Sequence, residues 1–390
     1  MISFEQGFDR VMSMVKKLSP VELGLSDAWG SFLLEEVHAP FPHPLFDMSA
    51  VDGYAVGGPQ GPWRILGEVA AGDTYLRSLS EGEALRIFTG GMVPQECFAV
   101  VMQEHAHVEG EALAVTAPVV GGSHIRRKGE QVTQGECLMQ AGERLDAAAI
   151  GLLASCGIER VKVTERPRVR IIRTGGEFMS NDEQIPGRIP SSNEHMLQAV
   201  LAAAGCKVLL PHELVVDERD ALAQAFSRAV QDADLVISTG GVSIGDHDLV
   251  RPVLEELGAQ VHVHGIAQKP GKPMLFATLN DRPVFGLPGN PRAVLILAWI
   301  YVLPFTKGMM GSETTRHNVH HLKLEEQVSL KGQRTEFRAA RVADGKLSLL
   351  RDEGSHMLRS LIHANALVRF PEDKRHYAVG DPVEVHYLPC

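Results

Sequence analysis

The sequence predicts a multi-domain chain, α/β plus β, in which a three-layer α/β domain lies between two β-rich units. Between residues 166 and 311, short β-branched runs alternate with segments of helical periodicity, which is typical of βαβ units. Before that stretch, residues 63–120 show short alternating runs broken by glycine, and after residue 311 only strand-like runs follow. At 390 residues, the chain is also too long for one ordinary hydrophobic core.

The segments before residue 166 predict helices, a turn and strands. Apolar residues such as Phe8, Val11 and Val15 recur at helical spacing near the start. In order, we expect a helix from residue 4, a second helical stretch up to residue 37, a proline-rich turn at 39–44, the small all-β unit at 63–120, a helix at 147–156 and a strand at 161–163.

The α/β domain is expected to begin near Arg166-Pro167. Its predicted strands are residues 169–172, 208–210, 235–238, 261–264, 274–277 and 284–285. Its predicted helices are residues 192–205, 218–230, 249–257 and 292–306, the first with Ser192 as N-cap and Gly205 as its stop. Short strands near residues 319–324, 336–342 and 383–387 then predict a β-barrel-like C-terminal domain.

Three glycine-rich turns follow predicted strands of the α/β domain. They are residues 173–177 (RTGGE), 238–243 (STGGVS) and 285–291 (FGLPGNP). Turns of this kind expose backbone N–H groups at the carboxyl edge of a parallel sheet, where open α/β sheets bind anionic ligands. Three such turns in one domain predict a ligand that carries phosphate.

Carboxylates accompany two of these turns. Glu177 follows the first turn, and Asp246 and Asp248 follow the second. Carboxylates beside a phosphate site are unfavourable unless a divalent cation bridges them to the ligand, and Mg²⁺ suits that arrangement. Capping of a helix N-terminus is the alternative for these acids. For Asp217, before the predicted helix at 218–230, the cap and the site remain equally open.

Other motifs carry polar groups outside these turns. Residues 47–55 (DMSAVDGYA) hold two aspartates and a serine, with a tight Asp-Gly turn as the alternative explanation, and residues 88–91 (FTGG) resemble the other glycine turns. The basic runs 126–128 and 269–273 are either ligand-facing or solvated loops. The pairs His105/His107 and His262/His264 could each share one strand face, which offers a rival metal site without an evident third ligand.

Composition narrows the class of protein. The formal net charge of −10 argues against general binding to nucleic acid or to acidic membranes. No apolar run reaches the roughly 18 residues of a membrane helix, and the N-terminal residues do not resemble a signal peptide, so we expect a cytoplasmic protein. The five cysteines form no CxxC pair and are odd in number, which predicts reduced thiols and neither a disulfide framework nor a cysteine zinc site.

These motifs, in this order, resemble the molybdopterin molybdotransferase family, which includes the C-terminal part of gephyrin. The matching stretches are 49–55 (SAVDGYA), 89–94 (TGGMVP), 100–104 (VVMQE), 125–130 (IRRKGE), 174–177 (TGGE), 238–243 (STGGVS), 269–273 (KPGKP), 286–291 (GLPGNP), 354–357 (GSHM) and 364–367 (ANAL). The resemblance covers essentially the whole chain.

The resemblance implies a fold and a set of domain boundaries. It implies an elongated N-terminal α/β domain formed by residues 1–46 and 131–165, with an inserted β domain at residues 47–130. A three-layer α/β molybdopterin-binding domain at 166–311 and a C-terminal β-barrel domain at 312–390 follow. It also implies a homodimer, with the active cleft formed between the α/β domain of one chain and the N-terminal part of the other.

The implied reaction is insertion of molybdate into adenylylated molybdopterin, with release of AMP and dependence on Mg²⁺. By motif position, the implied catalytic residues are Asp52, Thr89, Glu177, Asp217 and Asp248, with Glu177 and Asp248 also holding the metal. The implied substrate-binding residues are Thr174, Gly175, Gly240, Gly241, Ser243, Lys269, Lys272, Pro288, Gly289 and Pro291. The implied partners are the small-molecule substrates and, transiently, molybdopterin adenylyltransferase and molybdoenzymes.

The sequence also departs from the family pattern. Gly176 and Gln131 stand where the family usually has carboxylates, and Arg292-Ala293 stands where it usually has Val-Ser. The arginine is expected to add positive charge at the cleft. Two alternatives therefore stay open: a non-catalytic paralogue that binds molybdopterin or molybdate as carrier, sensor or scaffold, and an interaction protein that docks through its C-terminal barrel. Tungstate in place of molybdate stays open as well.

Overall fold

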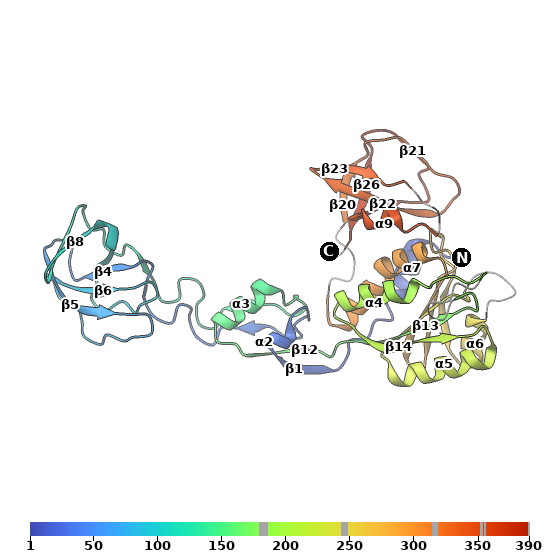
Figure 1. Cartoon of the computed structure of the whole chain (residues 1–390), viewed down its shortest axis with the longest axis horizontal. Coiled ribbons are helices and arrows are strands. Elements are labelled where there is room, and N and C mark those ends of the chain that lie inside the picture. The colour runs from blue at the N-terminus through green and yellow to red at the C-terminus, as the bar shows by residue number, and fades with distance from the viewer. Residues whose placement is uncertain (179–185, 243–248, 314–318, 352–353, 355, 389–390) are drawn as a thin grey trace.

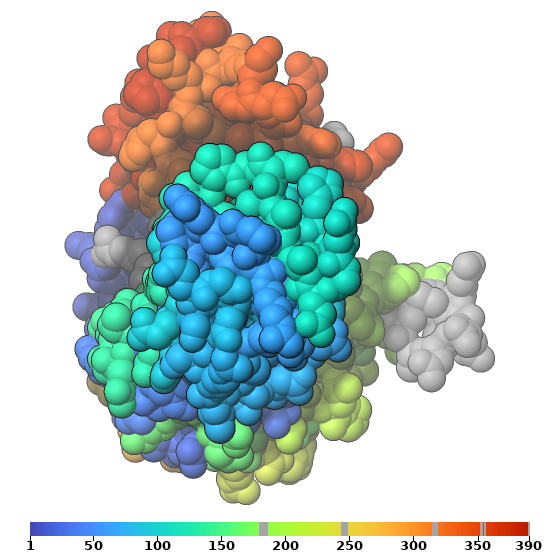
Figure 2. Space-filling model, turned by 90° about the vertical axis from the view of Figure 1, so that its left-hand side faces the viewer, coloured from blue at the N-terminus to red at the C-terminus, as the bar shows by residue number. Residues whose placement is uncertain are grey.

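The computed structural model describes residues 1–178, 186–242, 249–313, 319–351, 354 and 356–388. The chain is elongated (Figure 1): a β-rich insert lies at one end, a slender unit lies in the middle, and the α/β and C-terminal units lie together at the other end. Figure 2, seen along the long axis, shows the insert as a separate lobe in front of the rest of the chain.

The α/β domain is built on a six-stranded sheet. Its strand order is β14 (Lys207–Val215), β13 (Arg168–Thr174), β15 (Leu235–Thr239), β19 (Arg282–Leu287), β18 (Leu275–Leu279) and β16 (Gln260–His264). The first four strands are mutually parallel, and the last two run antiparallel to their neighbours. Strand β13 is flanked by β14 on one side and β15 on the other, so the chain reverses its direction of winding between β13 and β15. Open α/β sheets bind ligands at such a switch point, outside the carboxyl ends of the strands.

Helices cover both faces of this sheet. One core packs α4 (Asn193–Ala203) and the continuous helical segment α7 (Pro291–Leu297), η2 (Ala298–Val302) and α8 (Leu303–Met309) against the sheet. A second core packs α5 (Arg219–Asp232) and α6 (Val250–Glu256) on the opposite face. The predicted three-layer α/β domain is therefore confirmed.

Contrary to the expectation that the sequence has no apolar segment of membrane length, the segment Pro291–Met309 is long and apolar enough, by length and composition, to cross a membrane. Among the described residues it is the one helix of such length and apolar character. Of its most apolar 18-residue stretch, 89% is buried inside the protein. Its position in the core explains its composition, since a helix surrounded by the sheet and by other helices is apolar all round.

The N-terminal segment differs from the expected pair of helices. Helix α1 (Phe4–Met12) forms as expected, with Ser3 and Gln6 making a reciprocal capping box, but Phe4 and Phe8 pack into the α/β core beside Tyr301. The prediction of a second helical stretch up to residue 37 was wrong. The chain there forms strand β1 (Pro20–Gly24), followed by a single helical turn, α2 (Leu25–Ala28). The segment is a strand because it pairs with β12 (Arg160–Thr164). In β1 the more buried and more exposed side chains alternate, as in a strand with one face toward the core.

The middle unit is small. Strands β1 and β12 pair antiparallel, and α2 and α3 (Ala147–Ser155) pack beside them on a core that includes Leu33, Leu153 and Val163. A second two-stranded ribbon, β2 (Val37–His38) with β11 (Cys137–Met139), lies next to it. The whole insert lies between β2 and β11 in the sequence, so this ribbon is the point at which the chain leaves for the insert and returns.

The insert carries its own sheet, in agreement with the predicted all-β unit. Its strand order is β7 (Ala99–Met102), β4 (Gly53–Val56), β6 (Glu83–Ile87), β5 (Trp63–Val69), β9 (Ala112–Val115) and β8 (Ala106–Glu109). Buried Trp63 and Leu85 belong to the two apolar clusters of this sheet. A short ribbon of β3 (Met48–Ser49) and β10 (Ile125–Arg126) joins the insert's first and last residues.

The C-terminal unit is the expected barrel. Its described strands are β20 (Val319–Lys323), β21 (Val328–Ser329), β22 (Thr335–Ala343), β23 (Lys346–Leu349), β24 (Ala366–Phe370), β25 (His376–Tyr377) and β26 (Pro382–Tyr387), with the single helical turn α9 (Arg359–Ile362). The sheet runs β23-β22-β24-β26-β20, and a bridge between Leu324 and Leu347 joins its two edges. Strand β17 (Gln268–Lys269) of the α/β domain pairs with β22, which ties the barrel to the basic loop at 269–273.

Candidate functional site

The first two glycine turns meet at the switch point of the sheet. Strands β13 and β15 end at Thr174 and Thr239, and the Thr174 hydroxyl donates to the Thr239 carbonyl at 3.3 Å. Gly240 follows with a φ of 93°, and a Cβ at that position would lie 2.7 Å from both the carbonyl and the hydroxyl oxygen of Thr174. Only glycine fits here, because the two turns approach within the space that a side chain would occupy.

The third glycine turn lies against the second. The Gly240 N–H donates to the Leu287 carbonyl at 3.0 Å, and the Asn193 side chain donates to the Gly289 carbonyl at 2.8 Å. Pro291 takes the first position of α7, directly after this turn. The structure thus gathers most of the expected binding residues of the α/β domain at one edge: Thr174, Gly175, Gly240, Gly241, Pro288, Gly289 and Pro291.

Buried polar atoms are left unpaired at this edge. Asn193 Oδ1, Ser238 Oγ and Thr239 Oγ1 are buried and have no hydrogen-bond partner in the described part of the chain. An unpaired buried polar atom costs about 1–3 kcal/mol, so native proteins keep few of them away from sites that hold a ligand or water.

The carboxylates of this edge are only partly described. Glu177 is exposed, and its carboxylate lies over Gly175, so that a Cβ on Gly175 would be 2.2 Å from Glu177 Oε2. Asp217 is exposed and directly precedes Glu218, the N-cap residue of α5. The predicted Ser243 and Asp248, and Asp246 with them, lie outside the described residues.

A buried ion pair beside the first turn was missed by the sequence analysis. Arg173 hydrogen-bonds to Glu194, whose other carboxylate oxygen accepts from the Ser191 hydroxyl. Burial opposes ionisation of Glu194, but the hydrogen bond from Ser191 and the charge of Arg173 outweigh it and lower the pKa of Glu194. Glu194 neighbours Asn193, so this pair holds the start of α4 against the end of β13 and positions the Asn193 side chain. The only signal in the sequence is the arginine directly before the turn.

A cationic cavity of about 250 Å³ adjoins the third turn, between the α/β domain and the barrel. Its lining includes Lys269, Lys272, Pro288, Asn290, Arg292, Ala293, Arg334 and Glu336. Lys269 Nζ lies 3.4 Å from the buried Glu336 carboxylate, whereas Lys272 is exposed at the mouth. Four cationic side chains face one carboxylate here, so the cavity favours an anionic ligand. Arg334 was missed because it comes from the barrel, far along the sequence.

Three of the four departures from the family pattern, Gly176, Arg292 and Ala293, fall at this edge, whereas Gln131 lies at the base of the insert, where its N–H donates to the His43 carbonyl at 3.1 Å. Arg292 lines the cavity, as expected for added positive charge, but it is only 2% exposed and donates to Ser360 Oγ at 2.7 Å and to the Met357 carbonyl at 3.2 Å. Its guanidinium therefore also fastens the barrel to α7. Ala293 is buried and lines the same cavity, and a Cβ added to Gly176 would meet nothing within 4 Å.

Three motifs of the first half converge in the insert. Asp52 Oδ1 accepts hydrogen bonds from the Thr89 N–H at 2.8 Å and from the Thr89 hydroxyl at 2.7 Å. The backbone hydrogen bond from Thr89, then its hydroxyl, together with the charge of Arg86, lower the pKa of Asp52. The Asp47 carboxylate accepts from Arg127 Nη1 at 2.6 Å and from the Lys128 N–H at 2.8 Å, which ties down the first basic run.

The structure does not bring the two groups of predicted residues together within one chain. Asp52 and Thr89 lie in the insert at one end of the elongated molecule, whereas the glycine turns and Lys269 lie at the other end (Figure 1).

The rival histidine site is wrong for the described residues. His262 hydrogen-bonds to Thr278 and His264 to Arg251, so these rings serve the packing of β16. His105 ends the 3₁₀ turn η1 (Gln103–His105), while His107 lies in β8. Neither pair belongs to a cluster of three metal-ligating groups in the part of the chain that is described. Four of the five cysteines, Cys97, Cys137, Cys156 and Cys206, are free thiols, as expected.

Comparisons with known proteins define the class. Residues 2–157 match the MoeA N-terminal region (domain I and II), residues 170–308 a probable molybdopterin binding domain, and residues 321–388 the MoeA C-terminal region (domain IV). The chain is therefore a multi-domain protein with a molybdopterin-binding domain between the two MoeA regions. The edge of the sheet that carries the glycine turns belongs to this middle domain.

The relatives extend this match over the whole chain. A molybdopterin molybdenumtransferase of Nostoc sp. is 33% identical over 97% of this chain and 92% of its own length. One of Staphylococcus epidermidis is 28% identical over 98% and 95%. Solved structures of a molybdopterin biosynthesis MoeA protein from Pyrococcus horikoshii superpose with TM-scores of 0.81 and 0.82, at 29% and 26% identity, covering 99–100% of this chain and 100% of theirs. The chain belongs to the MoeA family of molybdopterin molybdenumtransferases, which confirms the resemblance seen in the sequence.

Proposed function

We propose that this protein inserts molybdate into adenylylated molybdopterin and releases AMP, as a transferase of molybdenum cofactor biosynthesis. The names of the relatives and the probable molybdopterin binding domain support the substrate class. The observation that carries the proposal in this chain is the cavity of about 250 Å³ with cationic walls beside the glycine turns.

The residues at this edge of the sheet have different proposed roles, which follow from their chemistry. Gly175, Gly240 and Gly241 let the backbone approach the substrate phosphates closely, and the Gly241 N–H binds a phosphate oxygen, because the N–H groups of Gly175 and Gly240 already donate to the Val215 and Leu287 carbonyls. Lys269, Lys272 and Arg334 bind the molybdate oxyanion and neutralise charge that develops as the phosphoanhydride breaks. Thr174, Pro288, Gly289 and Pro291 shape the remaining wall, and Ser243 is proposed to bind substrate on the strength of its motif position alone.

We propose that Glu177 and Asp248 hold Mg²⁺ and that Asp217 takes part in the reaction. The exposed Glu177 carboxylate fits this role, since it lies over Gly175 at the ligand edge and forms no ion pair with a described residue. When bound, Mg²⁺ would stabilise charge on the phosphate oxygens. The protein's part is to orient the phosphoanhydride against the lysines.

We further propose that the active form is a homodimer whose cleft takes Asp52 and Thr89 from the second copy. The elongated shape supports this, because the insert lies away from its own chain's cleft (Figure 1). The lowered pKa of Asp52 keeps its carboxylate ionised, ready to bind or orient a polar group of the substrate.

The setting of the reaction follows from its substrates. A molybdopterin adenylyltransferase supplies the adenylylated pterin, and molybdoenzymes receive the product, through transient contacts in the cytoplasm. Tungstate has the same shape and charge as molybdate and would meet the same donors, so competition between the two oxyanions belongs in any assay.

The test is release of AMP from adenylylated molybdopterin by the purified protein, with molybdate and Mg²⁺ each present or withheld. Release that requires both supports the transferase. Binding of the pterin without release, under conditions where a Nostoc relative turns over, would instead make this chain a carrier, sensor or scaffold.

A further inference from the structure

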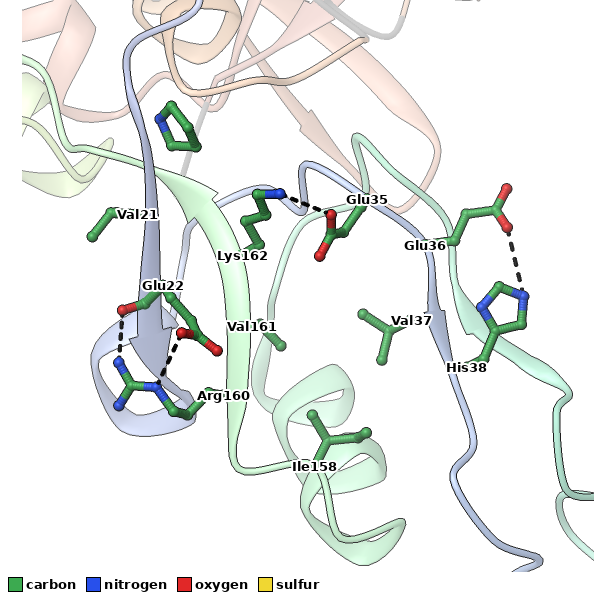
Figure 3. A pocket seen from close by; sticks show the side chains of 11 residues that line it. Val21, Glu22, Glu35, Glu36, Val37, His38, Ile158, Arg160, Val161 and Lys162 are labelled. Carbon is green, nitrogen blue, oxygen red and sulfur yellow. Dashed lines mark hydrogen bonds and ion pairs between the residues drawn. The ribbon is translucent and has the colours of Figure 1, made fainter.

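One cluster of metal-ligating side chains lies far from the proposed cleft, at the base of the insert. A carboxylate oxygen of Glu36, a ring nitrogen of His38 and Sγ of Cys137 all lie within 4.8 Å of one another. Glu36 Oε2 and His38 Nε2 are 3.6 Å apart, and Figure 3 shows these two side chains turned toward each other. No other group of three such ligands occurs in the described part of the chain.

The backbone places these three residues on one face. His38 and Cys137 are directly opposite in the antiparallel pair of β2 and β11. Side chains alternate along a strand, so Glu36, two residues before His38, projects from the same side. Opposed residues have Cβ atoms about 4.5–5.5 Å apart, which is a suitable distance for two ligands of one ion.

The chemistry of the set selects a particular class of ion. A thiolate, an imidazole and a carboxylate together suit Zn²⁺, and two anionic ligands balance its charge, with a water in the fourth position. Zinc bonds of about 2.0–2.3 Å place neighbouring ligand atoms roughly 3.3–3.8 Å apart, so the spacing of Glu36 and His38 already fits. All three side chains are at least partly exposed, so small rotations can bring the sulfur into place.

A further residue supports the sulfur. Gln140 Nε2 donates to Cys137 Sγ at 3.1 Å, from the turn that follows β11. A hydrogen-bond donor beside a thiolate stabilises its charge and fixes its orientation, as residues around metal ligands commonly do. Nearby charges are already paired elsewhere: Lys162 with Glu35, and Arg160 with Glu22 (Figure 3).

We propose that Glu36, His38 and Cys137 bind a zinc-class divalent ion that clamps the two strands connecting the insert to the rest of the chain. Glu36 and His38 lie on the outgoing segment and Cys137 on the returning one, so a shared ion cross-links the neck. Because β2 and β11 are only two and three residues long, that cross-link restricts how the insert swings. The clamp is separate from molybdate insertion and does not depend on it.

The test uses the full-length, metal-free protein titrated with Co²⁺ and followed by absorption. We expect a thiolate-to-cobalt charge-transfer band that saturates at one Co²⁺ per chain and that Zn²⁺ abolishes by displacement, whereas Co²⁺ taken up by the proposed Mg²⁺ site adds no such band. Cys137→Ser should remove the band, and His38→Gln should weaken Zn²⁺ binding by at least about tenfold. Cys97→Ser, which removes another partly buried thiol, and Cys390→Ser should leave both readouts unchanged.

A second readout tests the clamp itself. Zn²⁺ should slow amide hydrogen exchange in β2 and β11 of the unaltered protein and not of Cys137→Ser. Cobalt binding without the charge-transfer band, or a band that survives Cys137→Ser, would overturn the site. Binding that leaves exchange in the neck unchanged would overturn the clamp.

Discussion

Thr89 donates two hydrogen bonds to a single carboxylate oxygen of Asp52, one from its backbone at 2.8 Å and one from its hydroxyl at 2.7 Å. The two residues lie in different motifs, and their pairing fixes the position of an exposed carboxylate at the surface of the insert. Two donors on the ionised form lower the pKa of Asp52. This contact links a feature of the insert to chemistry proposed for another chain's cleft.

The first prediction concerns Asp52. Because its pKa is lowered, Asp52 stays ionised below the range where ordinary carboxyl groups take up a proton, and activity that needs this charge should persist there. Thr89→Ala removes one donor and should move the acid limb of the pH–rate profile upward. Asp52→Asn should reduce AMP release by about 100-fold or more without loss of folding, as followed by circular dichroism. Full turnover by Asp52→Asn would remove this residue from the reaction.

The second prediction concerns the cationic cavity. Lys272 is exposed at its mouth and holds no ion pair with a described residue, so its charge is available to an anionic substrate. Lys272→Ala should lower kcat/KM for AMP release by at least about tenfold. Lys17→Ala, which removes an exposed lysine elsewhere, is the matched control. An equal loss in both variants would mean that net charge, and not the cavity, is responsible.

The third prediction concerns Gly176, where the family usually carries an aspartate. Nothing lies within 4 Å of an added Cβ, and the backbone there is not in the left-handed region, so Gly176→Asp should fold normally. A second carboxylate beside Glu177 should lower the Mg²⁺ concentration for half-maximal AMP release by about tenfold. Gly151→Asp, at an equally open glycine of α3, should have no such effect. An unchanged Mg²⁺ requirement would place the metal away from Gly176.

The fourth prediction concerns the Arg173–Glu194 pair. Glu194 is 4% exposed, so Arg173→Met leaves a buried charge without its partner and should destabilise folding by about 3 kcal/mol, measured by urea unfolding. Adding Glu194→Gln should recover much of this loss, because no buried charge then remains. If the double variant is no more stable than Arg173→Met, the pair is not coupled as the geometry indicates.

The same pair makes stability depend on pH. The pKa of Glu194 in the folded state lies below its ordinary value of 4.5, so the ionised form is favoured by folding. Its contribution is therefore fully present above pH 4.5 and is lost as the pH falls through the lower folded value. Glu194→Gln should flatten this part of the stability profile.

Local sequence patterns predicted most strands and helices of the α/β domain. They predicted few of the contacts between elements that are distant in the sequence. The β-branched runs of β13 and β15 are short and continuous, so their burial in a parallel sheet could be predicted, and so could the glycine turns after them. The segment at β1 was mistaken for a helix because a strand of five residues is fixed by its partner β12 rather than by its own periodicity.

Contacts between residues that are distant in the sequence could not be predicted from hydrophobic periodicity. Arg173 meets Glu194 and Asp52 meets Thr89 only after the intervening elements have folded, and His38 meets Cys137 across a ribbon separated by the whole insert. The barrel's contribution to the cationic cavity, through Arg334, depends likewise on the pairing of β17 with β22.

The most direct test of the proposed shared cleft is subunit complementation with AMP release as the readout. Asp52→Asn damages the insert and Lys272→Ala damages the α/β cleft, so each variant alone should retain about a tenth of the unaltered activity or less. If the cleft is built from two copies, dimers of one chain of each kind contain one intact site. Random pairing should then restore about one quarter of the unaltered specific activity. A mixture no more active than the separate variants would contradict the shared cleft.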